Sequence, residues 1–195
     1  MSSTAGDSLR MPLLTPQPAL GDATPDLDAL RRGESAALGA CYRRHAADLL
    51  ATAYRLTASV EDAEDIVHDI FVDLPELLGH YEERGQFGGW LTRLAIRRAL
   101  MHKRRTKRAQ IVYADSVGMF PVPETPTQPD HFALRHVHHA LAALSPTLRH
   151  VFVLRAVHQL SHAEIAALLG IAVGTSEVRL HRAVRQLRQL LEVIR

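Results

Sequence analysis

The chain has 195 residues, which is enough for one medium domain or two small ones. Aromatic residues make up only 5% of it, and the helix formers Ala, Leu and Arg are plentiful, so the composition favours an all-α fold. Its one cysteine, Cys41, cannot form an internal disulfide, and no apolar run reaches the roughly 18 residues of a membrane span. The N-terminus lacks the layout of a signal peptide, so we expect a cytoplasmic protein.

The formal net charge of +2 hides an uneven distribution along the chain. Residues 1–92 carry 15 acidic and 7 basic side chains, whereas residues 93–130 and 131–195 each carry 8 basic and 3 acidic ones. An acidic front and two separate basic blocks indicate surfaces with different partners, although ordinary solvated faces would give the same counts.

Proline content and helical periodicity divide the chain into four segments. Residues 1–27 hold four prolines and little periodicity, which predicts a flexible tail. Helical periodicity covers residues 28–108 and returns over 131–195. Between them, residues 109–130 contain four more prolines, which predicts a linker. We therefore expect an all-α protein with two small helical domains joined by a Pro-rich flexible linker.

The stretch SHAEIAALLGIAVGTSEVRLHRA, residues 161–183, has the pattern of a helix-turn-helix. Ser161 and Glu164 fit a capping box, and Gly170 suits the turn that ends the first helix. In the second helix the leucines share one face, and the opposite side offers Arg179, Arg182, Arg185 and Arg188. Arginine binds guanine edges or phosphates through paired hydrogen bonds, so this face predicts a reader of the major groove. A helical hairpin with a solvated arginine face is the alternative.

A second basic block, FGGWLTRLAIRRALMHKRRTKR, spans residues 87–108. Eight of its last sixteen residues are cationic, more than the one or two that favour a helix C-terminus. Tyr81, Phe87 and Trp90 stand beside this basic track. Aromatic rings next to cations are typical of single-stranded DNA binding, because bases stack while cations follow the phosphates. The alternative is a set of core aromatic residues beside a solvated basic helix.

The preceding helical segment carries the opposite charge. At 100° per residue, five acidic residues fall within an arc of roughly 80°. They are Asp62, Asp65, Asp69, Asp73 and Glu76. This stripe is either solvated surface or a docking face for a basic protein surface. Pro75 should kink or restart the helix, because proline lacks a backbone donor.

Together these segments resemble the bacterial RNA polymerase sigma factors of the extracytoplasmic-function (ECF) group. The resemblance is carried by DAEDIVHDIFVDLPE, then FGGWLTRLAIRRAL, then the block from LSPTLRHV to AVRQLR, in that order. It covers residues 28–108, similar to sigma region 2, and 131–195, similar to sigma region 4. It implies a non-enzymatic transcription initiation factor that needs no cofactor and binds core RNA polymerase and promoter DNA. It also implies an anti-sigma partner and no insertion into the membrane.

The resemblance also implies roles for individual residues. The chain would contact the β′ clamp and the β flap of the polymerase. The residues expected to face the clamp are Asp62, Asp65, Asp69 and Asp73. The first domain would recognise and melt the −10 element, holding single-stranded DNA with Tyr81, Phe87, Trp90, Arg93, Arg97, Arg98, Lys103, Arg104 and Arg105. The second domain would read the −35 element as duplex with Thr175, Ser176, Glu177, Arg179, His181, Arg182 and Arg185.

Five residues depart from the pattern that is usual in this family: Arg97, Met101, Ala172, Ser176 and Glu177. Arg97 and Met101 stand where Asn and Asp are usual on the strand-separating helix. Ala172 lacks the hydroxyl that caps the recognition helix, which should cost roughly 1 kcal/mol unless Thr175 substitutes. Ser176 stands at an inward position that is usually apolar, and it should loosen the packing slightly.

Two other functions fit parts of the chain. A conventional helix-turn-helix regulator with an N-terminal sensing domain is the alternative function, but it would need neither a polymerase docking surface nor a strand-opening block. A metal site could be built from the 12 histidines, which include HVHH at 136–139. However, neither Cys-x-x-Cys nor His-Glu-x-x-His occurs, nor any nucleophile elbow, so we expect no metal and no catalytic residues.

Among the residues expected to contact DNA on the second helix, Glu177 is the only one with a negative charge. We expect it to read a base. A carboxylate near phosphates weakens nonspecific affinity, but it can accept a hydrogen bond from the amino group of cytosine. Glu177→Lys should therefore change the ranking of −35 sequences, measured as binding to a panel of duplexes. Equal strengthening on every duplex would show that Glu177 only repels phosphates.

Overall fold

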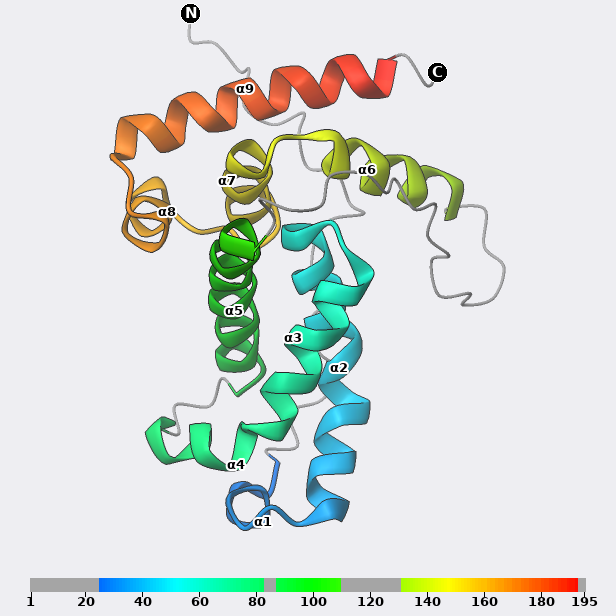
Figure 1. Ribbon diagram of the computed structural model, residues 1–195, viewed down its shortest axis with the longest axis vertical. Helices are drawn as coiled ribbons and strands as arrows, with labels where there is room; N and C mark the ends of the chain where they lie inside the picture. The colour runs from blue at the N-terminus through cyan, green and yellow to red at the C-terminus, as the bar shows by residue number, and fades with distance from the viewer. Residues whose placement is uncertain (1–24, 83–86, 110–130, 193–195) are drawn as a thin grey trace, which may run out of the picture. The chain divides into compact units, whose positions relative to one another are not determined.

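The computed structural model describes residues 25–82, 87–109 and 131–192, without the side chains of 103–109 and 131–136 (Figure 1). Within these ranges every regular element is helical. The helices form two compact units, the first containing α1 to α5 and the second α6 to α9. Most of the predicted tail (1–27) and of the predicted linker (109–130) lies outside the described residues.

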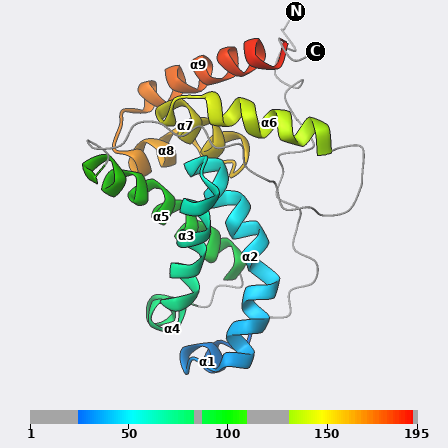
Figure 2. The same ribbon diagram turned by 45° about the vertical axis from the view of Figure 1, so that its right-hand side comes forward.

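The first unit is built on three long helices. Its elements are α1 (Leu27–Arg31), α2 (Ser35–Thr57), α3 (Val60–Val72), α4 (Leu74–Leu77), the 3-10 turn η1 (Leu78–His80) and α5 (Phe87–Ala109). Figures 1 and 2 show α2 and α3 side by side, and α5 also packs against both. Leu56, Ile70 and Leu91, one from each long helix, are fully buried between them. The burial of these apolar faces is the main source of stability for this unit.

Local signals set the ends of the helices in the first unit. α2 ends at Ala58, which adopts a left-handed backbone conformation with φ 57°. Ser59 then caps α3, because its side chain accepts a hydrogen bond from the backbone N–H of Asp62 at 3.1 Å. α3 stops at Val72, and the chain restarts as α4 with Pro75 in its first turn, as the sequence predicts.

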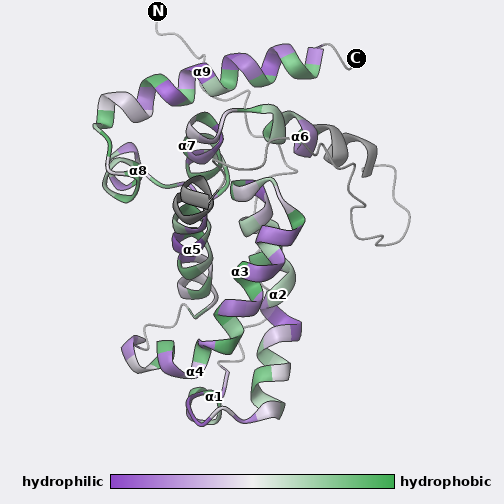
Figure 3. Ribbon diagram, viewed as in Figure 1, coloured by the Kyte–Doolittle hydropathy of each residue, from purple (hydrophilic) through white to green (hydrophobic). Residues whose placement is uncertain are grey.

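The second unit contains α6 (His131–Ala143), α7 (Pro146–Ala156), α8 (His162–Leu169) and α9 (Val173–Glu192). The longest of these, α9, packs against each of the other three. Its buried face consists of Ser176, Ala183 and Leu187, while hydrophilic residues fill much of the rest (Figure 3). None of the described helices is both long and apolar enough to cross a bilayer.

The segment from the start of α8 to the turn before α9 has the features that the sequence predicts. Ser161 accepts a hydrogen bond from the backbone N–H of Glu164, and the Glu164 carboxylate accepts one from the backbone N–H of Ser161 at 2.8 Å. Gly170 ends α8 in the left-handed conformation with φ 66°, where a Cβ would be strained. The α8–turn–α9 segment is therefore a helix-turn-helix in geometry as well as in sequence.

A buried arginine holds the start of the second unit, and the sequence pattern does not predict it. Arg149 on α7 is only 3% exposed. Its guanidinium donates hydrogen bonds to the backbone carbonyl oxygens of Ala142 at 3.2 Å and Leu144 at 3.5 Å. These carbonyls lie at the C-terminal end of α6, where backbone acceptors have no partner within the helix. Arg149 therefore links the end of α6 to α7.

Ser161→Ala should destabilise the second unit by about 1 kcal/mol, because the backbone N–H of Glu164 at the start of α8 loses its hydroxyl acceptor. Chemical denaturation of the whole chain, followed by circular dichroism, measures this change. Ser161→Thr keeps the hydroxyl and should stay close to the original stability. An alanine variant as stable as the threonine variant would contradict the role of the cap.

Candidate nucleic-acid interface and docking face

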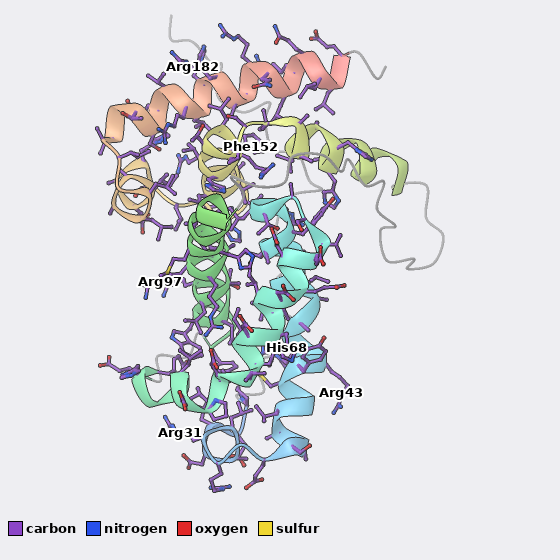
Figure 4. The ribbon with its side chains drawn as sticks, in the orientation of Figure 1. Arg31, Arg43, His68, Arg97, Phe152 and Arg182 are labelled. Carbon is purple, nitrogen blue, oxygen red and sulfur yellow. The ribbon has the colours of Figure 1, made fainter. Side chains whose placement is uncertain are left out.

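The outward face of α9 carries most of the residues predicted to read duplex DNA. Glu177, His181, Arg182 and Arg185 are exposed, and Thr175 and Arg179 are half-buried. Arg182 is labelled on α9 in Figure 4. These side chains surround the first half of α9, directly after the turn from α8. This is the part of a helix-turn-helix that enters a major groove.

Ser176 does not belong to this outward face, which corrects one of the predicted contacts. Its side chain is fully buried, and its hydroxyl lies 2.9 Å from Nδ1 of His162 on α8. A buried hydroxyl needs such a partner, since an unsatisfied one costs free energy. Ser176 therefore joins the two helices of the motif, and His162 supplies the partner that the sequence pattern alone does not indicate.

The sequence reasoning missed an apolar residue on the same outward face. Val178 is 51% exposed although it is an aliphatic side chain. It lies between Glu177 and Arg179 in the chain and one turn before Arg182. The helical periodicity of the sequence could have identified Val178 as outward-facing, because residue 178 lies on the side of α9 opposite Ser176, which is buried.

The basic track on α5 is only partly free in the first unit. Arg93 and Arg97 are exposed on this helix, and Arg97 is labelled in Figure 4. Arg98 instead donates a hydrogen bond to the Asp73 carboxylate across the unit at 2.7 Å. The side chains of Lys103, Arg104 and Arg105 lie outside those described. The exposed pair, Arg93 and Arg97, is thus the described part of the track that can meet phosphates.

The predicted base-stacking residues form one aromatic cluster around the start of α5. The ring of Tyr81 lies 4.8 Å from Trp90 and 5.6 Å from Phe87, measured between centroids. Phe87 also contacts Trp90 and His45, and burial lowers the pKa of that histidine, with Arg44 acting in the same direction. Tyr81 and Phe87 are buried, whereas Trp90 is half-exposed.

This burial corrects part of the prediction for single-stranded DNA. Tyr81 and Phe87 serve as core residues that hold Trp90 in place, and they do not offer an open stacking platform. Trp90 is the one ring of the three that is only partly buried. Residues 83–86, between Tyr81 and Phe87 in the chain, lie outside the described residues.

The acidic stripe on α3 divides into two sets. Asp65 and Asp69 are exposed, as a docking face requires. Asp62 and Asp73 are instead half-buried and turned toward α5, where Asp62 lies 3.3 Å from His102 and Asp73 pairs with Arg98. These two acids are thus partly committed within the unit, which corrects their assignment as simple surface docking residues.

Two exposed apolar side chains accompany the outward acids and were not predicted. Val72 at the end of α3 is 62% exposed, and Tyr42 on α2 is 50% exposed. The Tyr42 ring packs on that of Phe71, with centroids 4.9 Å apart. An apolar spot next to carboxylates is typical of a protein-binding surface, where apolar burial supplies affinity and charges supply orientation. We call Tyr42, Asp65, Asp69 and Val72 the docking face.

The residues that could hold a metal do not come together in the described part of the chain. No group of three histidine, cysteine, aspartate or glutamate side chains there has the arrangement of a metal site. From the HVHH run, His139 is exposed, while the side chain of His136 is outside the described set.

These units define a class of protein: a duplex-reading helix-turn-helix combined with a helical unit that has one acidic and one basic side. The family model for "Sigma-70 region 2" matches residues 41–109, and the family model for "Sigma-70, region 4" matches residues 134–187. The two matches cover the first unit from α2 onward and most of the second unit. A conventional regulator would not explain the first match, so that alternative is not favoured.

Curated relatives agree with the family descriptions. The chain is 33% identical over 163 residues to "ECF RNA polymerase sigma factor SigL" of Mycobacterium tuberculosis, covering 82% of this chain and 91% of the relative. It is 32% identical over 177 residues to "ECF RNA polymerase sigma factor SigE" of Mycolicibacterium smegmatis, where it spans 66% of the relative's length. The chain therefore belongs to the ECF sigma factors, the group of factors that direct transcription initiation at promoters.

Solved structures support the same fold. The sigma factor RpoE, in a complex with the anti-sigma factor NepR from Bartonella quintana, is 26% identical, with a TM-score of 0.55 over 76% of this chain and 92% of that one. CnrH, in a complex with the cytosolic domain of CnrY, is also 26% identical, with a TM-score of 0.50 over 86% of this chain and 95% of that one.

The single thiol of the chain should be unreactive. Cys41 on α2 is buried, and this burial raises the pKa of its thiol to about 11, although the charge of Arg44 opposes the rise. Only the thiolate reacts, so alkylation by iodoacetamide near neutral pH should be slow in the folded chain and fast in denaturant. Because the folded pKa is raised, ionisation of this group should lower stability as pH rises from about 9 toward 11. Rapid alkylation of the folded chain would contradict the burial of Cys41.

Proposed function

We propose that this chain binds core RNA polymerase, carries it to one class of promoters and assists in opening the DNA there. The observation that supports this most is that one chain combines a face suited to duplex DNA with a separate unit suited to protein docking and single-stranded DNA. A helix-turn-helix face on α9 suits duplex DNA, and the first unit has both a docking face and exposed cations beside a tryptophan. A factor that only binds duplex DNA would need just the first of these.

In this proposal the docking face on α2 and α3 meets a basic surface of the polymerase clamp. Asp65 and Asp69 offer two exposed carboxylates, and Val72 and Tyr42 offer apolar area beside them. Asp62 and Asp73 act differently, because their contacts with His102 and Arg98 direct them toward α5 and away from the docking face. The polymerase contact at region 4, the β flap, belongs to the same proposal.

The α5 side of the first unit takes the single strand of the −10 element. Trp90 provides a partly exposed ring for a base, and Arg93 and Arg97 follow the phosphates. The buried rings of Tyr81 and Phe87 keep the indole in one orientation, so less ordering is required when a base arrives. The free energy for strand opening then comes from these contacts, which replace base stacking.

The α9 side reads the −35 element as duplex with Arg179, Arg182 and Arg185, joined by Glu177 and His181. In this proposal Thr175, half-buried near the start of α9, contacts a phosphate. No covalent step is assigned to the chain, since the polymerase makes the RNA, and no cofactor is required. These partners place the protein in the cytoplasm.

An anti-sigma protein is a further proposed partner. The solved structures of RpoE and CnrH each contain a bound partner, the anti-sigma factor NepR and the cytosolic domain of CnrY. By similarity, a protein of that type would restrain this chain by covering surfaces that the polymerase needs.

Run-off transcription with purified core polymerase on a pool of promoter fragments tests the proposal. We expect transcripts that depend on this chain, and their start sites will locate both promoter elements. Stable core binding without any transcript would contradict the role in promoter opening. Absence of core binding would overturn the proposal as a whole.

A matched pair of variants separates docking from nonspecific charge effects in that assay. The double variant Asp65→Lys, Asp69→Lys should weaken core binding by about tenfold or more, because like charges then face each other. The double variant Asp28→Lys, Glu192→Lys reverses two exposed acids outside the docking face and should leave core binding unchanged. Equal effects of the two would place the docking face elsewhere.

A further inference from the structure

The outward face of α9 carries one exposed apolar side chain, Val178, near its centre. At 100° per residue, Val178 lies about 160° from Ser176 and about 140° from Ala183, both of which are fully buried. Val178 therefore points away from the body of the unit, in agreement with its 51% exposure. Gly174, one turn earlier on the same side, has open space around the position of a Cβ.

Charged and polar side chains surround this apolar spot. Glu177 is its neighbour in the chain, and His181, Arg182 and Arg185 follow at three, four and seven residues. All four are exposed and lie on the same half of the helix. A single exposed valine is ordinary on most surfaces. Here, however, a residue with only modest helix propensity stands in the middle of the face that would enter the groove.

The major groove offers one apolar feature to such a side chain, the C5-methyl group of thymine. The arginines around Val178 can bind guanine edges or phosphates, and Glu177 can accept a hydrogen bond from cytosine, but none of them recognises a methyl group. Because Gly174 has no side chain, the helix backbone can approach the base edges closely next to Val178. The surface thus has a small apolar contact where a base edge would lie.

We propose that Val178 is a specificity-determining residue that recognises a thymine methyl group in the −35 element. This inference rests on the proposed function and adds to it the identity of one base. It predicts that affinity depends on a single methyl group at one position of the DNA, and that this dependence comes from one side chain.

The test uses the whole chain bound to core polymerase on a promoter from the run-off assay. Each thymine of the −35 element is replaced in turn by deoxyuridine, which removes the methyl group and leaves all base pairing unchanged. We expect one position at which the replacement weakens promoter binding by about threefold to fivefold, the effect of losing one buried methyl contact. With Val178→Ala, the same replacement should have no effect.

Val173→Ala is the matched control, since Val173 is also exposed, at 45%, and lies on the same helix. It should retain the sensitivity to deoxyuridine. Thermal unfolding of both variants checks that the second unit stays folded. The proposal is overturned if no thymine is sensitive, or if Val178→Ala keeps the full sensitivity. Promoter-dependent transcription with either of these results would leave the proposed function standing, whereas absence of core binding would overturn both proposals.

Discussion

A helix that buries one stripe of side chains determines where all its other side chains point, and both surfaces of this protein depend on that constraint. In α9 the buried stripe of Ser176, Ala183 and Leu187 turns Val178 and Arg185 outward. In α3 the buried stripe of Ile66 and Ile70 turns Asp65, Asp69 and Val72 outward. The core thus orients the binding surfaces without contributing any contact to a partner.

Two contacts between α3 and α5 divide the charges of the first unit. Asp73 with Arg98, and Asp62 with His102, take two acids and two basic groups out of the outward faces. Both contacts are partly exposed to solvent, so each contributes little to stability. Their main effect is on direction, because the remaining acids face one side and the remaining arginines, Arg93 and Arg97, lie on another helix. A single small unit can then present opposite charges to a protein and to DNA.

Buried polar and aromatic groups add rigidity to the two faces that we propose bind nucleic acid. The hydrogen bond between Ser176 and His162 joins α9 to α8 inside the helix-turn-helix. The rings of Tyr81 and Phe87 support Trp90 in the first unit. In the first unit Trp90 is only partly buried while the rings that support it are buried, and in the second the buried Ser176 lies beneath the exposed face of α9. This arrangement reduces the conformational freedom that binding would otherwise have to remove.

The sequence by itself determined the helical fold, the break at Pro75, the capping box at Ser161 and the turn at Gly170, because these signals act within one or two turns of the chain. Only the tertiary structure decided which polar residues face inward. The pairing of Asp73 with Arg98 joins residues 25 positions apart, and the contact of Ser176 with His162 joins two helices. Such contacts depend on how the helices pack, and helical periodicity cannot specify packing. For the same reason the exposed Val72 and Tyr42 became recognisable as surface residues only in the folded chain.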